Sequence, residues 1–439
     1  MKLLDRLSVE QLRSLADWPK FTSTIKELEK EAAENSKFAR SELKGLLQKH
    51  FSLQVQKEQA MICAWATGIG KTRAATTAMN DIGGKWLIVH FMDVHKNTWL
   101  DEKITADVTF VTYKSLAKYK NQIFDGIILD EGHHISPANL IALNEIGAEY
   151  KIILSATIPS EKKELMYQWC NTLKVNKIEV QDGINRGLLP RPKIILCPMT
   201  LDKTEPTEIY DFVKRKGGFW KTITYKYFVE NPAIHAMWTN YHITCTPQEK
   251  HDLLTGDILH FSKLYFAEKE IWQNTRWQQA NMARKTFLSN VKQKATRRIH
   301  EIFKESEGRY LVFAHILEQL QELTACNIVH SKMKNNQRVI DDFNAKKINS
   351  IFTIEMLTES QNLVEIDYVL IGTLNTNQSG NFQKFGRSLR GELPIIVIPY
   401  VKGTIDEKNM QKFIGNMAKW AITITSPSEL RTNGIKRKD

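Results

Sequence analysis

The sequence predicts an α/β protein with two parallel β-sheets, a helical segment before the first sheet and a mostly helical stretch between the two. Two sets of short apolar runs, at about residues 60–180 and 308–405, are separated by helical stretches, a pattern typical of buried parallel strands. The stretch between the two sets is rich in Trp, Lys, Arg and Gln. A chain of 439 residues fits two or three domains, at about 100–200 residues each.

The first half of the chain divides at two changes of pattern. Leucines recur at helical spacing over residues 1–50, which predicts a helical accessory segment. The segment 51–181 is expected to be the first α/β domain, because five of its apolar runs have the length of buried strands: MICAWA, KWLIVHF, VTFVTY, GIILD and KIILSAT. The segment 182–305 is expected to be a helical, basic and Trp-rich insertion or linker.

Apolar runs return in the second half. The segment 306–405 is expected to be a second α/β domain, with strands at RYLVFAH, NIVH, SIFTI, DYVLIG and PIIVIPY. The last segment, 406–439, predicts a C-terminal helix followed by a basic tail.

The composition excludes several classes of protein. Apolar residues make up 42%, which excludes collagen-like and wholly disordered chains. Lys and Arg number 61 against 49 Asp and Glu, and the resulting net charge of +12 favours a polyanionic partner. Five cysteines without a CxxC pair suggest neither a disulfide framework nor a zinc site. No signal-type or membrane-spanning run is evident, so a cytoplasmic protein without membrane contact is expected.

The sharpest local pattern is WATGIGKT, which lies between the first expected strand and a helix. Gly68 and Gly70 would let backbone N–H groups approach phosphates, and the helix N-terminus adds partial positive charge. Lys71 would place its charge on the β- and γ-phosphates, and Thr72 would offer a hydroxyl to Mg²⁺. The pattern therefore predicts a nucleotide site formed by Thr67, Gly68, Ile69, Gly70, Lys71 and Thr72. Its strict form has Gly at the first position, where this chain has Trp65.

About sixty residues later, the string GIILDEGHH is an apolar strand that ends in two carboxylates. Asp130 would hold Mg²⁺, and Glu131 would polarise the attacking water, because hydrolysis of a triphosphate needs a base beside the metal.

Two further strings extend the pattern. SAT, at residues 155–157, follows another expected strand, and QKFGRSLR, at residues 383–390, lies in the second domain. Arg387 and Arg390 are three residues apart and share one helical face, so they could reach across an interdomain cleft to a γ-phosphate. An arginine pair on a solvated surface helix is the alternative.

Taken in order, these strings resemble the motifs of superfamily 2 helicases, over about residues 60–180 and 308–400. ATGIGKT resembles motif I, DEGH a motif II of the DEAH type, SAT motif III and QKFGRSLR motif VI. The resemblance implies two RecA-like domains that bind ATP and Mg²⁺ between them. It also implies a catalytic set of Lys71, Asp130, Glu131, Arg387 and Arg390.

The resemblance assigns further roles. Nucleotide contacts are implied for Asn362, at the end of the motif V-like TIEMLTESQNL, and for Gln383. Coupling and nucleic-acid contacts are implied for Thr112, His133, Ser155, Thr157 and Thr353. The glutamine that reads adenine stays open among Gln54, Gln56 and Gln59.

The implied activity is an ATP-dependent motor that translocates on, unwinds or remodels DNA in replication, recombination or repair, alone or with other proteins of those processes. The sequence most resembles bacteriophage-type helicases related to the branch-migration, restriction-translocase and Swi2/Snf2-like branches, which implies a host cytoplasm. Single-stranded, duplex or branched DNA is the expected partner. An RNA helicase and a non-motor protein that uses ATP as a clamp or switch are the alternatives.

The expected insertion interleaves tryptophans with basic side chains. Such a surface can bind phosphates and stack bases. The alternative is that the tryptophans are core residues and the charges are solvated. The tryptophans concerned are Trp220, Trp238, Trp272 and Trp277.

Overall fold

The fold was analysed in a computed structural model of the chain. It describes residues 28–32, 36–91, 93–156, 158–172, 174–214, 216–237, 239–324, 326–330, 333, 336–354, 363, 365–374, 386, 389, 391 and 393–435. Six residues singled out in the sequence lie outside the described residues: Thr157, Trp238, Asn362, Gln383, Arg387 and Arg390.

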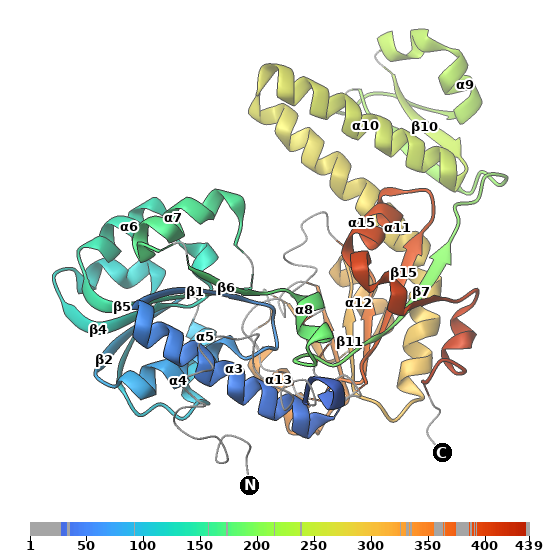
Figure 1. The fold of residues 1–439 in the computed structure, drawn as a ribbon. Helices are drawn as coiled ribbons and strands as arrows, with labels where there is room; N and C mark the ends of the chain where they lie inside the picture. The colour runs from blue at the N-terminus through green and yellow to red at the C-terminus, as the bar shows by residue number, and fades with distance from the viewer. Residues whose placement is uncertain are drawn as a thin grey trace.

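The first lobe is built on a six-stranded, fully parallel sheet in the order β3-β2-β4-β5-β1-β6 (Figure 1). Its strands are β1 (Ala60–Trp65), β2 (Lys85–His90), β3 (Asp107–Thr112), β4 (Ile123–Leu129), β5 (Gly147–Ser155) and β6 (Val175–Ile178). The first five are the predicted apolar runs, which are thereby confirmed. They are nearly continuous in apolar residues because helices cover both faces of the sheet.

The side chains of β2 point alternately to the two covered faces of the sheet. Trp86 and Ile88 belong to one buried cluster, and Leu87 and Val89 belong to the other. The helices of this lobe are α3 (Lys37–Glu58), α4 (Lys71–Ile82), α5 (Asp93–Leu100), α6 (Pro137–Asn144) and α7 (Ser160–Cys170). Short 3₁₀ helices follow β3 and β4, namely η3 (Tyr113–Tyr119) and η4 (Gly132–His134).

The second lobe contains a seven-stranded parallel sheet in the order β12-β13-β11-β14-β15-β7-β16. Five strands are predicted runs: β11 (Tyr310–Phe313), β12 (Ile328–Val329), β13 (Ser350–Thr353), β14 (Tyr368–Ile371) and β15 (Ile395–Val401). The other two, β7 (Lys193–Met199) and β16 (Ala421–Thr423), come from segments predicted to lie outside this domain. The lobe's helices are α12 (Leu317–Leu323), α13 (Asn336–Asn344) and α15 (Ile405–Ile414), with 3₁₀ turns η7 (Gly415–Trp420) and η8 (Pro427–Leu430) near its end.

The segment 182–305 is less uniformly helical than the sequence predicts. Helix α8 (Val180–Asn185) leads from the first lobe into β7, and the chain then forms a separate sheet in the order β8-β10-β9. Its strands are β8 (Glu208–Phe212), β9 (Trp220–Thr224) and β10 (Asn240–Cys245), with α9 (Tyr225–Glu230) and η5 (Pro232–Ala236) between the last two. Helices α10 (Pro247–Glu268) and α11 (Ile271–Lys304) then return to the second lobe, so the insertion stands on that lobe (Figure 1).

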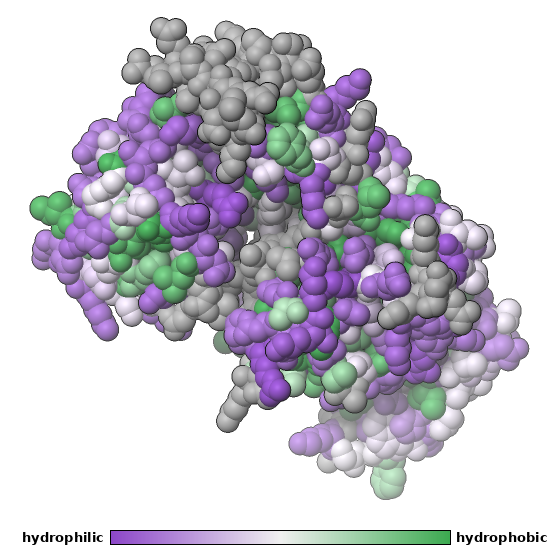
Figure 2. Space-filling view, turned by 90° about the horizontal axis from the view of Figure 1, so that it is seen from below, coloured by the Kyte–Doolittle hydropathy of each residue, from purple (hydrophilic) through white to green (hydrophobic). Residues whose placement is uncertain are grey.

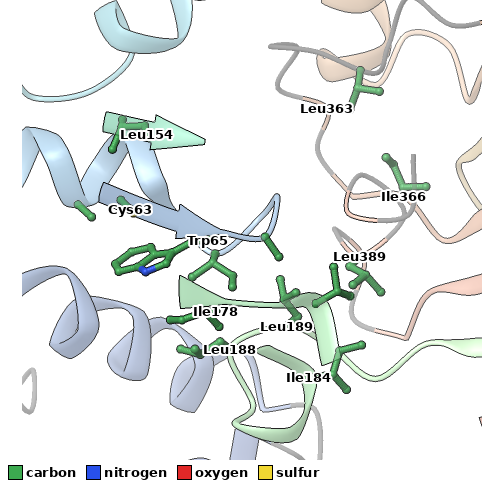
Figure 3. Packing of buried hydrophobic residues seen from close by; sticks show 14 of the residues in the cluster. Cys63, Trp65, Leu154, Ile178, Ile184, Leu188, Leu189, Leu363, Ile366 and Leu389 are labelled. Atoms are coloured by element: carbon green, nitrogen blue, oxygen red, sulfur yellow. The ribbon is translucent and has the colours of Figure 1, made fainter. Parts of the chain in front are cut away.

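A buried apolar cluster continues from the first lobe into the second. It contains Cys63 and Trp65 of β1, Leu189 of the interlobe linker and Leu389 of the second lobe (Figure 3). By contrast, the face of the molecule in Figure 2 is mainly hydrophilic, and its hydrophobic side chains are scattered.

Candidate functional site

Three predicted site segments meet at one edge of the first sheet. Strands β1, β4 and β5 are parallel neighbours in the order β4-β5-β1, so their carboxyl ends lie at the same edge. The glycine loop follows β1, Asp130 and Glu131 follow β4, and Ser155 ends β5. Ligands of open α/β sheets bind outside the carboxyl ends of the strands.

The loop between β1 and α4 has the backbone of an anion site. Gly68 has φ +90° and Gly70 has φ +108°, conformations that L side chains rarely adopt. Gly70 is the N-cap of α4, and no side chain of the described residues caps this helix. The N–H groups in its first turn can therefore serve a phosphate.

Trp65 explains the departure from the strict glycine pattern. It is the last residue of β1, and its ring is buried against Phe51 of α3, with ring centroids 5.4 Å apart (Figure 3). Its indole Nε1 donates to Asn176 Oδ1 of β6 at 2.8 Å. The side chain thus points into the core, away from the loop backbone that would face phosphates, so the bulky residue is compatible with the turn.

Lys71 and Asp130 form the charged centre of the edge. The Lys71 ammonium donates to the Trp65 carbonyl oxygen at 3.1 Å. Asp130 is buried, and burial raises the pKa of its carboxyl above the ordinary value, while the Trp99 hydrogen bond and the Lys71 charge lower it.

Both oxygens of Asp130 are held by hydrogen bonds. Oδ1 accepts from the Glu131 backbone N–H at 3.0 Å, and Oδ2 accepts from the indole of Trp99 at 2.9 Å. Trp99 lies on α5 and is completely buried. Sequence reasoning missed Trp99, because it lies 31 residues before its partner and belongs to no phosphate-binding pattern.

Trp99→Phe is expected to lower ATP turnover and raise the Mg²⁺ concentration needed for half-maximal nucleotide binding. It removes the donor that orients Asp130, and loss of such an outer partner typically costs roughly 10–100-fold in metal affinity or activity. Fluorescent-nucleotide binding over a Mg²⁺ titration measures the effect apart from turnover.

Trp169→Phe is the matched control. Trp169 is equally buried in the same lobe, and its indole N–H has no hydrogen-bond partner among the described residues. Equal changes in the two variants would show that the smaller side-chain volume, and not the bond to Asp130, is responsible.

Glu131 and His133 connect motif II-like residues to β5. Glu131 adopts a left-handed backbone conformation, φ 47° and ψ 53°, a strain of about 1–3 kcal/mol that is characteristic of functional sites. His133 Nδ1 lies 3.5 Å from Glu131 Oε2 and 3.2 Å from Ser155 Oγ. His133, the predicted coupling residue, thus lies close both to Glu131, the predicted base, and to Ser155 of the motif III-like string. Gly132 between them has no room for a Cβ, which would collide with Ile153 of β5.

Helix α3 supplies two neighbours of the loop that sequence reasoning missed. Lys44 Nζ donates to the Gly68 carbonyl at 2.7 Å, and a Cβ on Gly70 would lie 3.1 Å from Gln48 Nε2. The i, i+4 spacing of Lys44 and Gln48 on one helix face is the signal that could have revealed them.

The three glutamines considered for adenine each have another partner. Gln54 accepts from Asn176, Gln56 donates to Ser52, and Gln59 donates to Glu149. None of these partners belongs to the glycine loop.

The second lobe touches the glycine loop at the motif VI-like string. A Cβ on Gly386 would lie 2.6 Å from Thr67 Cβ, and the Gly386 carbonyl oxygen lies 3.5 Å from the Cβ position of Gly68. Leu389 is buried in the shared cluster. Gly386, next to the predicted arginines in the sequence, therefore lies at the phosphate loop, and Arg387 and Arg390 themselves are outside the described part.

Two other residues predicted to contact nucleic acid, Thr112 and Thr353, differ in burial. Thr112 ends β3 and is half-buried. Thr353 ends β13 and is completely buried, so its side chain does not reach the surface in this conformation.

Comparisons with known proteins agree with this arrangement. Residues 291–392 match the family model of the helicase conserved C-terminal domain. This match covers β11 to β14 of the second lobe and the motif IV- to VI-like strings. Residues 291–392 are thus similar to the C-terminal domain of helicases.

Solved structures with a TM-score above 0.5 share the fold of this chain at low identity. Dbp5 of S. cerevisiae, bound to RNA and ADP BeF3, is 11% identical with a TM-score of 0.51, covering 85% of this chain and 87% of that one. A putative HsdR subunit of a type I restriction enzyme from Vibrio vulnificus is 14% identical with a TM-score of 0.51, covering 87% and 68%. The Hef helicase domain of Pyrococcus furiosus is 13% identical with a TM-score of 0.43, covering 84% and 97%. No curated protein matches the sequence significantly.

The residues of the site fit ATP with Mg²⁺. Mg²⁺ is usually held by one or two carboxylates, with substrate phosphates and waters completing the shell. Asp130 and the Thr72 hydroxyl would hold it in this way, and the bound ion would neutralise phosphate charge. The described residues contain no cluster of three or more His, Cys, Asp or Glu suited to a metal. Within the same residues, no helix has the length and apolar character to span a bilayer.

Proposed function

We propose that this chain is a superfamily 2 helicase, an ATP-driven motor that translocates on or remodels DNA, near the branch-migration, restriction-translocase and Swi2/Snf2-like branches. The observation that carries the proposal is the contact between Gly386 of the second lobe and Thr67 of the phosphate loop. A nucleotide at this loop would lie where the lobes meet, so binding and hydrolysis would alter the interlobe contact.

The link from His133 to Ser155 and the surface charge support the same proposal. The link joins the hydrolytic carboxylates to the end of β5, so a change at the nucleotide is passed to a second strand. The net charge of +12 favours a polyanionic track. The preference for DNA is supported by the sequence resemblance alone, and the Dbp5 structure with RNA keeps an RNA helicase as the second candidate.

Steady-state ATP hydrolysis with and without nucleic acid tests the proposal. We expect hydrolysis to rise with single-stranded or forked DNA more than with RNA of the same length. A larger rise with RNA would favour the RNA helicase. Nucleotide binding without turnover under any condition would contradict the motor and favour an ATP-dependent clamp or switch.

A further inference from the structure

The interlobe linker packs directly on the phosphate loop. It consists of α8 and residues 186–192, which lead from the first lobe into β7. Leu189 of this linker is 1% exposed, and its Cδ2 atom lies 3.3 Å from the point where a Cβ on Gly68 would stand. A leucine of the linker thus occupies the space beside a glycine whose backbone would face phosphates.

A second contact between the loop and the linker lies at Gly183 of α8. A Cβ at this position would stand 3.2 Å from Ile69 Cδ1 of the loop and 3.0 Å from Leu189 Cδ1. Ile69 is completely buried, and the Leu189 backbone N–H donates to the Gly183 carbonyl at 3.0 Å. The missing side chain of Gly183 therefore leaves the room in which Ile69 and Leu189 pack. Both residues belong to the buried cluster that also contains Leu389 of the second lobe (Figure 3).

Residues before α3 hold the backbone of the same linker. Gly187 has φ +69°, and a Cβ on it would stand 2.5 Å from the Cβ of Ala32, which is itself buried. Arg186 Nε lies 3.8 Å from Glu29 Oε1. The linker is therefore in contact with residues 28–32 as well as with the phosphate loop, and these contacts limit how far it can move away from the loop.

Close packing lets this cluster pass small displacements between the lobes. Protein interiors are about as dense as organic crystals, so a side chain that moves displaces the atoms around it. A phosphate held by the loop backbone would act on Gly68, and Leu189 is the linker side chain beside that residue. We propose that Leu189 is a positioning residue that couples nucleotide binding at the phosphate loop to the second lobe, and thereby to the affinity for nucleic acid.

This proposal rests on the proposed nucleic-acid motor, and it assigns part of the coupling to the linker in addition to the contact at Gly386. The test measures how much a non-hydrolysable ATP analogue with Mg²⁺ changes the affinity for nucleic acid. Fluorescence anisotropy with a labelled oligonucleotide, as DNA and as RNA, gives the dissociation constant with and without the analogue. The ratio of the two constants is the coupling factor, which is typically about 5–150-fold in allosteric proteins.

Leu189→Ala is expected to reduce the coupling factor to below about twofold, while the affinity for nucleic acid without nucleotide stays near the wild-type value. The variant removes the side chain that stands between Gly68 and Gly183. Leu189→Met is expected to keep the wild-type factor, because it conserves most of the buried volume.

Leu188→Ala is the matched control. Leu188 is the neighbouring linker residue, is completely buried and belongs to the same cluster. No atom of Leu188 lies within 4 Å of the Cβ positions of Gly68 or Gly70. The two alanine variants lose the same apolar volume, so Leu188→Ala should lose comparable thermal stability and keep the wild-type coupling factor.

The outcomes separate this proposal from the motor itself. Wild-type protein whose affinity for both oligonucleotides is unchanged by the ATP analogue would overturn the proposed function. A clear wild-type coupling factor that persists in Leu189→Ala, or that falls equally in Leu188→Ala, would overturn the role of Leu189 alone. Thermal unfolding verifies the fold of each variant. Leu189→Val, which removes less of the side chain, serves if Leu189→Ala does not fold, and it is expected to lower the factor in the same direction.

Discussion

Lys71→Ala is expected to reduce ATP turnover by about 10²-fold or more while leaving the fold intact. Lys71 is the first residue of α4, its ammonium donates to the Trp65 carbonyl, and its charge lowers the pKa of the buried Asp130 carboxyl. Removing a single positioned donor from a charged transition state typically costs about 10²–10³-fold in turnover. Steady-state hydrolysis at saturating ATP measures the effect, and thermal unfolding verifies that the variant is folded.

Lys49→Ala is the matched control for this variant. Lys49 lies on α3 and pairs with Asp81 of α4 at 2.8 Å, in a partly exposed ion pair close to the same helix. Such pairs contribute about 0–1 kcal/mol to stability, so turnover should stay near the wild-type value. Wild-type hydrolysis by Lys71→Ala would contradict the assignment of this loop as the ATP site.

The sequence predicted most of both sheets because their central strands are buried on two faces. The run IIL in β4 and the run YLVF in β11 are apolar without alternation. Such runs can be recognised from a few consecutive residues of the sequence. Strand β6 was missed because it is an edge strand in which Ile178 alone is buried. Strand β7 is as apolar as the central strands, but its partner β15 follows about 200 residues later. The composition of the neighbouring residues therefore led to the prediction that β7 belongs to the insertion.

The candidate site shows the same division between local and long-range information. Glycines, lysine and threonine of the loop were predictable because phosphate binding needs them at fixed spacing along the chain. The hydrogen bonds of Trp99 to Asp130 and of Lys44 to Gly68 join residues 31 and 24 positions apart. They depend on how α5 and α3 pack on the sheet, and a single sequence does not specify that packing.

Arg387→Ala and Arg390→Ala are each expected to reduce nucleic-acid-stimulated hydrolysis by roughly 10³–10⁵-fold, the range measured for arginine fingers. Gly386, next to the first arginine in the chain, packs against Thr67, and Leu389, next to the second, is buried in the cluster shared by the lobes. Gly386 thus stands at the loop where the γ-phosphate would lie. ATP should still bind, because the loop itself belongs to the first lobe.

Single-turnover hydrolysis with saturating nucleic acid separates this effect from a general reduction of charge. Arg298→Ala removes an exposed arginine of α11 that pairs with Glu301 at 2.8 Å, and it should change hydrolysis little, since surface ion pairs contribute about 0–1 kcal/mol. The two expectations differ by orders of magnitude, so modest errors in protein concentration do not matter. A reduction below about tenfold in both Arg387→Ala and Arg390→Ala would contradict an interlobe catalytic site. The contact between Gly386 and Thr67 would then be structural, and ATP would act as a clamp on the first lobe.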